Sequence, residues 1–380
     1  MNNDTLYQGP IDAFLVGFRA KFDAITDQGL QSLNQIKNYK LVDTDPMAMT
    51  IFTNVTSETT EGERAVWRHI GTTGLQQMLA RKAGGTYQDA TFIRNYETAV
   101  YDPDNQLAEQ LKVPEEREMK EDKDYKTILN RALKLVQKID RYNIIDPFEV
   151  LNLGYTAVSS YPGGVASGRF FARGNRGLDS NFSALGEALF STVHARADGG
   201  ATQSNVVRNG SACLSLSYAN YWSAKEQGAS FKDDVGDAMP GFGGKTCLLV
   251  PPKNALGLVA QTIQQSEWIP GSNNNDVNIV KGEFSSTICS PYLSDSYYIP
   301  STSATTSLQG YQWHLVDEEN RDPEVGSGLV RIEFVPLQQR TERDIYTDSI
   351  MYKIKEEFSY GFVEWRHVLS SLGNNISFTG

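Results

Sequence analysis

The stretch ALFSTVHARADGGATQSN, residues 188–205, brings together the residue types of a catalytic site. Ser191, His194 and Asp198 could act as nucleophile, base and orienting acid, and the glycines that follow would let a substrate approach the backbone. A working serine nucleophile usually occupies a strained turn such as GxSxG, and the sequence contains no such motif. His194 and Asp198 could also ligate a metal, but no third ligand is in view. The spacing therefore favours a structural histidine over a serine hydrolase.

The composition is that of an ordinary globular protein with an acidic balance. The chain has 380 residues, of which 40% are hydrophobic, and a formal net charge of −11. This length predicts two or three structural units around a substantial core. The excess of acidic over basic residues argues against a surface that neutralises nucleic-acid phosphates. Such an excess more often serves to keep a protein soluble. Three widely spaced cysteines, Cys213, Cys247 and Cys289, are expected to be small buried residues rather than disulfide or zinc ligands.

The sequence shows no targeting or cofactor signal. The N-terminal residues MNNDTLYQGP lack the basic and apolar regions of a signal peptide, and no apolar run is long enough to span a bilayer. We therefore expect a soluble protein made in the cytoplasm. Neither GxGxxG nor GxxxxGK[ST] occurs, so no nucleotide cofactor is predicted.

Two segments of the N-terminal third carry different patterns. After Pro10, large apolar residues recur at helical spacing and predict an amphipathic arm, which includes Ile11, Phe14, Leu15, Phe18, Phe22 and Ile25. The pattern alone fits equally a helix on the core of its own domain and one that docks on a neighbouring subunit. From Met49 to Tyr101, short alternating pieces predict strands, with Met49, Ile51 and Val55 in one and Phe92, Tyr96 and Val100 in another. Few large aliphatic residues lie between these pieces. We therefore expect an extended excursion that gains its stability by lying on another surface.

Periodicity predicts the main elements of the remaining chain. The clearest helix covers residues 120–141 and is roughly 30 Å long, with Pro147 beyond its end. Further helices are predicted near residues 182–189, 218–222 and 255–263, and strands at 246–250, 277–280, 296–299 and 313–316. Near the C-terminus, residues 330–334 alternate, and residues 352–362 keep their apolar side chains on one parity. This pattern predicts a half-buried antiparallel strand that the helix at 120–141 would cover.

Four stretches of the chain follow one another in a recognisable order. They are LFSTVH at 189–194 with Ser204 and Asn205 after it, LLVPPKN at 248–254, VNIVKGEFSSTICSPYLSDSYYI at 277–299, and the strand through residues 358–365. Each string alone is of low specificity. In this order and spacing they resemble the major capsid proteins of tailed bacteriophages, and look most like the branch that contains the Mu-type major head subunit.

The resemblance implies an α+β protein with the phage major capsid (Johnson) fold. It assigns residues 1–46 to an N-terminal arm, 47–104 to a projecting two-stranded extended loop, 105–164 with 326–380 to a peripheral domain on a long spine helix, and 165–325 to an axial domain. The stretch 188–205 becomes a helix end that leads into an axial-domain loop, which Ser191 and His194 would hold by hydrogen bonds. Many relatives carry a long N-terminal scaffolding segment that a protease removes. This chain begins with a short arm, so we expect scaffolding to be separate or absent.

The implied function is structural. The resemblance implies a non-enzymatic virion protein of the Caudoviricetes that self-assembles in the host cytoplasm, as hexamers and pentamers, into an icosahedral shell around double-stranded DNA. The implied partners are further copies of the chain and, through weak sequence-independent contact, the packaged DNA. Separate scaffolding, portal and decoration proteins are candidate partners, and no membrane, metal or cofactor is expected. Candidate subunit-interface residues are Ile11, Phe14, Leu15, Phe18, Phe22, Trp67 and Tyr96. The alternatives are an encapsulin-like cellular nanocompartment shell and a serine hydrolase that uses Ser191 and His194.

Overall fold

The computed structural model separates the chain into two compact units. Unit 1 contains Met1–Met47, Leu107–Ile144 and Val335–Glu356, and unit 2 contains Ala48–Gln106, Ile145–Phe334 and Glu357–Gly380. Within them, the structure describes residues 51–56, 59–61, 64–69, 97–101, 107–114, 143–157, 170–172, 188–196, 199–233, 236–239, 241–242, 247–269, 276–293, 310–317, 328–344, 346, 349–362 and 364–378. These residues mix α-helices and β-sheets, as the sequence predicts.

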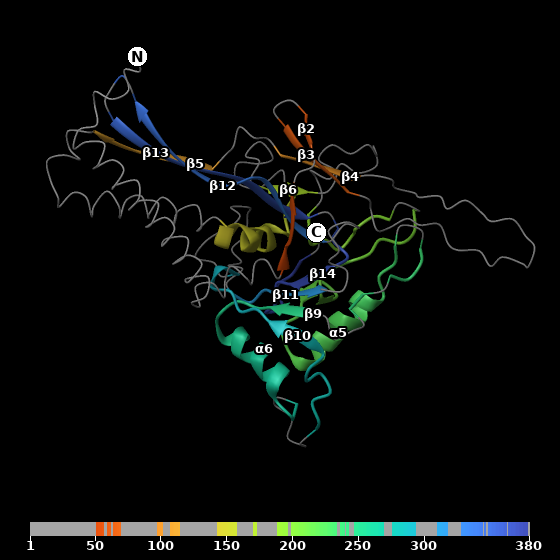
Figure 1. The fold of residues 1–380 in the computed structure, drawn as a ribbon. Helices are drawn as coiled ribbons and strands as arrows, with labels where there is room; N and C mark the ends of the chain where they lie inside the picture. Colours follow the sequence, from red (N-terminus) through yellow and green to blue (C-terminus); the bar gives the residue numbers. More distant parts are fainter. Residues whose placement is uncertain are drawn as a thin grey trace, which may run out of the picture. The chain divides into compact units, whose positions relative to one another are not determined.

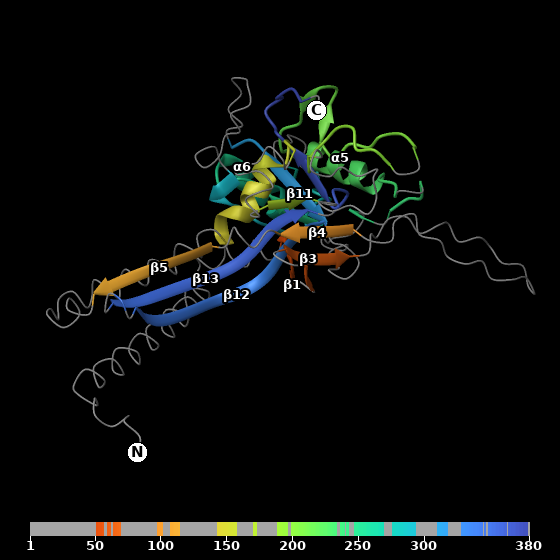
Figure 2. The same cartoon turned by 90° about the horizontal axis from the view of Figure 1, so that it is seen from above.

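Three strands make up the described sheet of unit 1. β5 (Leu107–Pro114) pairs antiparallel with β13 (Ser349–Phe362), in a register that sets Pro114 opposite Ser349 and Leu107 opposite Glu356. β12 (Leu329–Asp344) lies on the other side of β13. Figure 2 shows the three strands side by side. The side chain of Asn143 donates to Glu356 Oε2 at 3.0 Å and so ties a helical segment to this sheet.

The ends of β12 and β13 that belong to unit 2 pair with short strands. β1 (Thr53–Thr56) runs parallel to β12 at residues 330–333, and β6 (Phe170–Ala172) runs parallel to β13 at residues 360–362. Residues 356–362 of β13 are buried at every position, on both parities. The prediction of a half-buried strand is therefore wrong in this part. β13 is an interior strand here, and both of its faces are covered.

A four-stranded sheet forms the core of unit 2. Its order is β10 (Phe284–Thr287), β9 (Cys247–Val250), β11 (Trp313–Asp317) and β14 (Val368–Ser371). β9 and β10 are parallel, whereas β11 is antiparallel to both β9 and β14. Every residue of β9, β11 and β14 is buried, so this sheet is covered on both faces.

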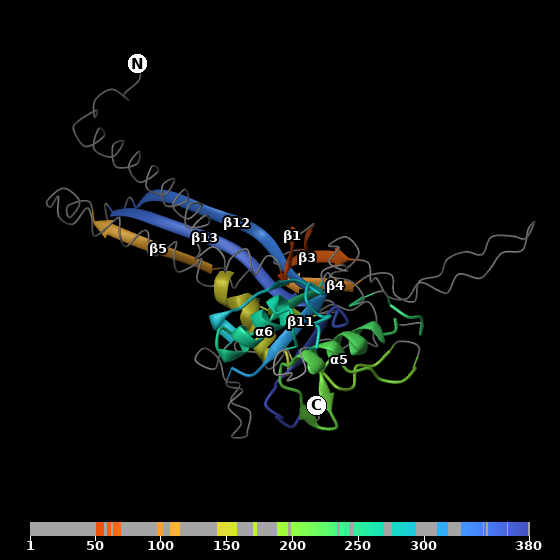
Figure 3. The same ribbon diagram turned by 90° about the horizontal axis from the view of Figure 1, so that it is seen from below.

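Two helices flank this sheet, as Figures 1 and 3 show. α5 (Tyr218–Ala229) begins at the N-cap Ser217, whose side chain accepts from Asn220 N, and α6 (Ala255–Gln265) begins at the N-cap Asn254, whose side chain accepts from Leu256 N. α5 packs closely because Gly228 has no side chain: an added Cβ would lie 2.3 Å from the Phe242 ring.

The remaining strands of unit 2 are short. β2 (Thr59–Glu61), β3 (Arg64–His69) and β4 (Glu97–Tyr101) form an antiparallel sheet among the described residues of the predicted loop region. β7 (Arg208–Asn209) and β8 (Ala212–Cys213) form a hairpin, and Pro291–Leu293 form a 3-10 turn.

Many of the predicted elements are confirmed. The helices near residues 218–222 and 255–263, the strands at 246–250 and 313–316, and the two long C-terminal strands are all present. Val55 and Val100 lie in β1 and β4, whereas Ile51 is helical rather than extended. The arm, the helix at 120–141, the strand at 296–299, Met49, Phe92 and Tyr96 lie outside the described residues.

Three elements differ from the predictions. Ala188 and Leu189 form a bridge and a bend instead of a helix end, while Phe182 and Leu185 lie outside the described residues. At residues 277–280 only Val277 makes a bridge, and residues 279–280 turn. Residues 143–153 are helical although Pro147 lies among them. This helix is almost wholly buried, and burial of Phe148, Val150 and Leu151 outweighs the cost of one proline.

Candidate functional site

The stretch that suggested catalysis forms a small closed loop in unit 2. His194 and Gln203 are bridged antiparallel, with both backbone N–H···O bonds at 2.9 Å. The chain therefore leaves the core after His194 and returns at Gln203, two residues before the buried Asn205. Gly199, with a φ of 73°, lies in the excursion between them. Asp198 is outside the described residues.

Asn205 is the centre of the polar contacts around this loop. Its Nδ2 donates to the backbone carbonyls of Leu189 (2.7 Å), Val368 (3.2 Å) and Trp365 (3.3 Å). Its Oδ1 accepts from the Ser191 N–H at 3.0 Å. The side chain is fully buried, and these contacts join segments that are 160 residues apart in the sequence. Asn205 thus fastens the loop to the chain around β14.

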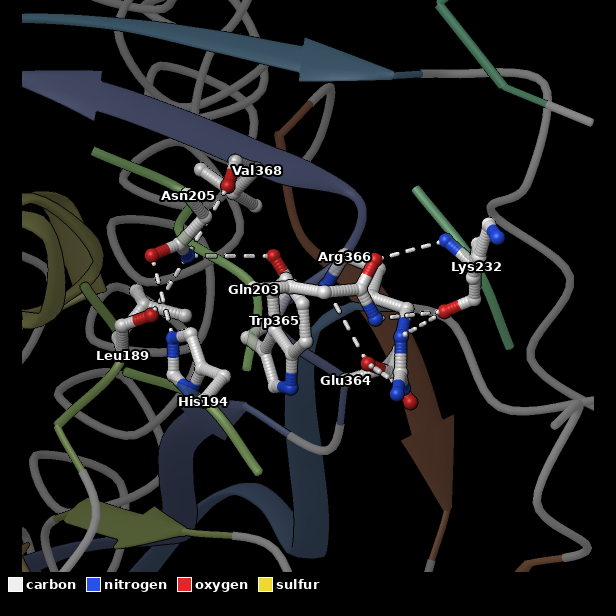
Figure 4. Close-up of polar contacts among 9 residues, drawn as sticks. All are labelled: Leu189, His194, Gln203, Asn205, Lys232, Glu364, Trp365, Arg366 and Val368. Atoms are coloured by element: carbon white, nitrogen blue, oxygen red, sulfur yellow. Dashed lines mark hydrogen bonds and ion pairs between the residues drawn. The ribbon is translucent and has the colours of Figure 1, made fainter. Parts of the chain in front are cut away.

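The ring of His194 also contacts the side chain of Asn205. Its Nε2 lies 3.1 Å from Asn205 Oδ1. Because the Nδ2 of Asn205 is fixed as a donor by three carbonyls, its Oδ1 must accept, and Nε2 of His194 must carry a hydrogen. The same ring stacks on Trp365 with centroids 4.1 Å apart and an interplanar angle of 4°. Figure 4 shows these contacts. A nitrogen that already donates cannot take the proton of a nucleophile.

Ser191 is also engaged locally. Its Oγ accepts from the Val193 N–H at 3.2 Å, and its backbone carbonyl accepts from Asn205 N. The prediction that Ser191 and His194 hold this loop by hydrogen bonds is therefore confirmed. The hypothesis of a nucleophile and base has no geometric support in these contacts, since His194 Nε2 is directed at Asn205.

A second group of contacts extends the cluster to Lys232 and Arg366. Gln203 exchanges two hydrogen bonds with the backbone of Lys232, at 2.7 and 2.8 Å. Arg366 Nε donates to the same Lys232 carbonyl at 3.0 Å, and Arg366 Nη1 donates to Glu364 at 2.9 Å. The guanidinium also lies 4.5 Å from the centroid of Trp365. Arg366 is 2% exposed, so its charge is compensated inside the protein rather than by water.

A serine and a histidine do meet elsewhere in unit 2. Ser370 Oγ in β14 lies 2.7 Å from His314 Nδ1 in β11, and Tyr155 Oη lies 2.6 Å from the same Oγ. Both His314 and Ser370 are completely buried. Burial lowers the pKa of His314 from 6.5 to about 3 and raises the pKa of Tyr155 above its usual value. This chain of hydroxyls and imidazole is closed to substrates, and we interpret it as a link between two strands.

The structure describes few of the predicted interface residues. Ile11, Phe14, Leu15, Phe18, Phe22 and Tyr96 lie outside the described residues, and for Trp67 only the backbone is described, in β3 opposite Ala99. Among the described ranges, no cluster of three or more His, Cys, Asp or Glu side chains could hold a metal ion. In the part of the chain that the structure describes, no helix has the length and hydropathy of a membrane span.

Sequence reasoning missed the central residues of both clusters. Asn205 drew attention only as part of the Ser204–Asn205 pair, and Ser370 belonged to no predicted element. The contacts of Asn205 reach backbone carbonyls, which leave no trace in side-chain patterns. His314 did lie in a predicted strand, in which Trp313 and Leu315 share the opposite face, but only the structure shows that the face of His314 is buried as well.

Comparison with known proteins gives matches at the level of solved structures. No family model matches the sequence, and a search of the curated proteins finds no match. The capsid of the native GTA particle is 9% identical, with a TM-score of 0.45, over 89% of this chain and 91% of that chain. The mature capsid of bacteriophage PhiM1 is 10% identical, with a TM-score of 0.43, over 87% of each chain. The virus-like particle from Pyrococcus furiosus is 8% identical, with a TM-score of 0.35, over 87% of this chain and 95% of that chain.

Proposed function

We propose that the chain is a shell-forming major capsid protein of a tailed bacteriophage, in the branch of the Mu-type major head subunit. Copies assemble as hexamers and pentamers into an icosahedral shell around double-stranded DNA, in the host cytoplasm, and the protein remains in the virion without an enzymatic role. One observation carries this proposal. The four stretches that resemble the family are far apart in the sequence, yet their described parts belong to one framework in unit 2.

The first and fourth stretches meet at Asn205. Its side chain binds the carbonyls of Leu189 in the first stretch and Trp365 at the end of the fourth. The second and third stretches meet through β9 and β10, which pair in parallel, and through a bridge between Pro252 and Ser290. The Ser370 N–H donates to the Asn205 carbonyl at 3.0 Å, which ties this junction to the sheet. Chance matches have no reason to converge in this way.

The charge of the chain supports a container for DNA rather than a DNA-binding protein. A net charge of −11 favours weak contact with packaged nucleic acid, since tight binding to phosphates needs a basic excess. A portal protein, a decoration protein and a scaffold, the last either separate or absent, are the candidate further partners in this role. The proposed subunit interfaces include the N-terminal arm with Phe14 and Phe18, whose apolar face would be buried on a neighbouring copy.

Electron microscopy and sedimentation of the purified full chain, alone and with a cognate scaffold, test the proposal. Closed shells are the expected result, and a stable monomer under all conditions would overturn it. Substitution of Phe14 and Phe18 by Asp should leave a folded subunit that no longer assembles. Unchanged assembly would show that the arm belongs to the core of its own subunit.

The contents of the particle separate this function from that of a cellular compartment. DNA inside the shell supports a capsid, whereas protein cargo without nucleic acid supports an encapsulin-like shell. For the serine hydrolase, the decisive variant is His194→Ala. Loss of a measured hydrolytic activity in a variant that keeps its fold would favour the enzyme, against the geometry of His194 and Asn205.

A further inference from the structure

One asparagine of the sequence is followed directly by glycine, at Asn209 and Gly210. In the structure this pair lies at the turn of the β7–β8 hairpin, where Asn209 pairs with Ala212 and the loop consists of Gly210 and Ser211. The φ of Gly210 is 62°, whereas Ser211 has no positive φ. A glycine with positive φ at the first loop position is typical of a type II′ turn. The hairpin therefore favours glycine directly after Asn209.

The side chain of Asn209 is available for reaction. It is exposed, and its amide has no hydrogen-bond partner among the described residues. By contrast, the amides of Asn205, Asn254 and Asn278 each donate to a backbone carbonyl. The amide carbon of Asn209 can therefore turn toward the peptide group that follows it.

The backbone nitrogen of Gly210 is equally accessible. In the described part of the chain its N–H has no backbone acceptor, since the pairing of the hairpin joins Asn209 and Ala212. Apart from the chain neighbours of Gly210, no heavy atom lies within 4 Å of the position that a Cβ would take there. An unhindered nitrogen one residue beyond an amide carbon is placed for an intramolecular reaction.

Two other exposed asparagines lack this arrangement. Asn374 is followed by Asn375, whose N–H donates to the Cys213 carbonyl at 3.1 Å. Asn375 is followed by Ile376, whose N–H donates to the Gly373 carbonyl at 3.0 Å. Attack by either nitrogen would break its hydrogen bond, and both residues carry side chains that hinder the approach. The structure therefore disfavours the same reaction at both positions.

We propose that Asn209 is a self-modification site, at which the folded chain converts this asparagine into aspartate and isoaspartate. The Gly210 nitrogen bonds to Asn209 Cγ, its proton passes to the amide nitrogen, and the Cγ–Nδ2 bond breaks with release of ammonia. The product is a five-membered succinimide. Water then adds to one of the two ring carbonyls. Opening at Cγ gives aspartate, and opening at the former backbone carbonyl gives isoaspartate. The reaction needs only the chain and water, so the inference does not depend on the proposed function.

The modification has a structural consequence for the C-terminal residues that the hairpin holds. The Phe378 N–H donates to the Ser211 carbonyl at 2.8 Å, and Arg208 Nη1 donates to the Phe378 carbonyl at 3.1 Å. The ring of Phe378 lies edge-on to Tyr155, with centroids 5.1 Å apart. Isoaspartate routes the backbone through Cγ and so adds one carbon to a two-residue loop whose geometry sets the strand pairing. We therefore expect isoaspartate to loosen Phe378 from the hairpin.

Incubation of the purified full chain in mildly alkaline buffer, followed by mass spectrometry of digests, tests the site. Relative to an unincubated sample, the peptide that contains Asn209 should gain about 1 Da, with aspartate and isoaspartate forms resolved by chromatography. Conversion at Asn209 should be at least about tenfold faster than at Asn374 or Asn375. An unmodified Asn209, or equal rates at the three positions, would overturn the proposal.

Asn209→Gln is the matched control for the consequence. It keeps an exposed amide but must close a six-membered ring, so its conversion should be at least about tenfold slower. After the same incubation, amide hydrogen exchange at Phe378 should be faster in the wild type and unchanged in Asn209→Gln. Equal exchange in the two incubated proteins would refute the loosening of Phe378.

Asn209→Asp separates the new charge from the added backbone carbon. Freshly purified, this variant carries the carboxylate of the aspartate product on a normal backbone, so Phe378 should exchange as slowly as in the fresh wild type. Exchange as fast as in the incubated wild type would show that the charge alone opens the contact, which contradicts the role given to isoaspartate.

Discussion

The surroundings of Asn205 and the exposed side chains beside α6 depart from the usual distribution of side chains in opposite directions. Around Asn205, unit 2 buries polar groups, including His194 at 2% and Arg366 at 2% exposure. On and just after α6, the same unit exposes four large apolar side chains, which we call the apolar patch: Leu258, Trp268, Val277 and Ile279. Neither arrangement favours the stability of an isolated subunit when it is compared with an all-apolar interior and an all-polar surface.

The two regions differ in whether the buried polar or exposed apolar side chains have partners within the subunit. Asn205, His194 and Arg366 have hydrogen-bond partners inside the subunit, and these bonds offset the free-energy cost of removing their polar groups from water. The patch side chains lack cover within the described part of the chain. The Asn205 cluster therefore determines which loops come together, whereas the patch makes no comparable contribution to the fold. Substitutions in the first region should lower the free energy of unfolding, and substitutions in the second should leave it nearly unchanged.

The strongest test of this division is Asn205→Leu. It removes the donors to three carbonyls and the acceptor for His194 Nε2, all of them buried. We expect a loss of about 3–5 kcal/mol in the free energy of unfolding, measured by urea denaturation of dissociated subunits. Asn209→Leu, at an exposed position in β7, is the matched control and should change it by less than about 0.5 kcal/mol. Equal effects of the two variants would contradict the role of Asn205.

A second test uses pH and concerns the buried histidine of β11. His314 has a pKa of about 3 in the folded protein and about 6.5 when exposed. Between these values the unfolded chain binds a proton that the folded chain does not, so stability falls as the pH drops from 6.5. The slope is about 1.4 kcal/mol per pH unit, which gives a loss of about 2 kcal/mol at pH 5.

His314→Phe should remove this loss, because a phenyl ring does not titrate and can still stack on Phe190. Ser370 keeps Tyr155 as a hydrogen-bond partner in the variant. Denaturation curves from pH 7.5 to 4.5 give the difference in the free energy of unfolding between variant and wild type. Burial also lowers the pKa of His367, but this residue is present in both proteins, so its contribution cancels in the difference. A difference that is constant over this range would show that His314 does not contribute to acid sensitivity.

A smaller effect is expected from His194→Phe. The substitution keeps a ring that can stack on Trp365 and removes one hydrogen bond to Asn205 Oδ1, which still accepts from Ser191. We expect a loss of about 1 kcal/mol in the free energy of unfolding, with association unchanged. A loss above about 3 kcal/mol, as for a broken buried network, would mean that His194 rather than Asn205 holds the loop.

The sequence predicted regular elements better than it predicted these two regions. α5, α6, β9 and β11 were predicted from their apolar residues. The buried positions of α6 and β9 are indeed uncharged, whereas α5 also buries Lys225 and β11 also buries His314 and Asp317. Residues 277–280 have the β-branched composition of a strand, but only Val277 makes a bridge and residues 279–280 turn, since the side chain of Asn278 binds carbonyls at the end of α6. Local propensity cannot register a side-chain bond to a carbonyl of another element.

The candidate site illustrates the same limit. The residue types of Ser191 and His194 suggested chemistry, and the absence of GxSxG correctly weakened that hypothesis. The decisive partner, Asn205, contacts Trp365 across 160 residues of sequence. The sequence indicated that His194 is structural, whereas only the fold shows what holds it. The apolar patch escaped notice because Trp268 and Val277 look like ordinary core residues until their exposure is known.

The smallest effect on folding should come from the patch. In Val277→Asp, the backbone bridge to Trp268 and the inward bonds of Asn278 remain, and the new carboxylate lies in water. The free energy of unfolding of dissociated subunits should therefore change by no more than about 0.5 kcal/mol, as it should for Val193→Asp at another exposed valine of unit 2. Urea denaturation at low protein concentration measures this. A loss comparable with that expected for Asn205→Leu would show that the patch packs within its own subunit, in which case the contrast with the Asn205 cluster would not hold.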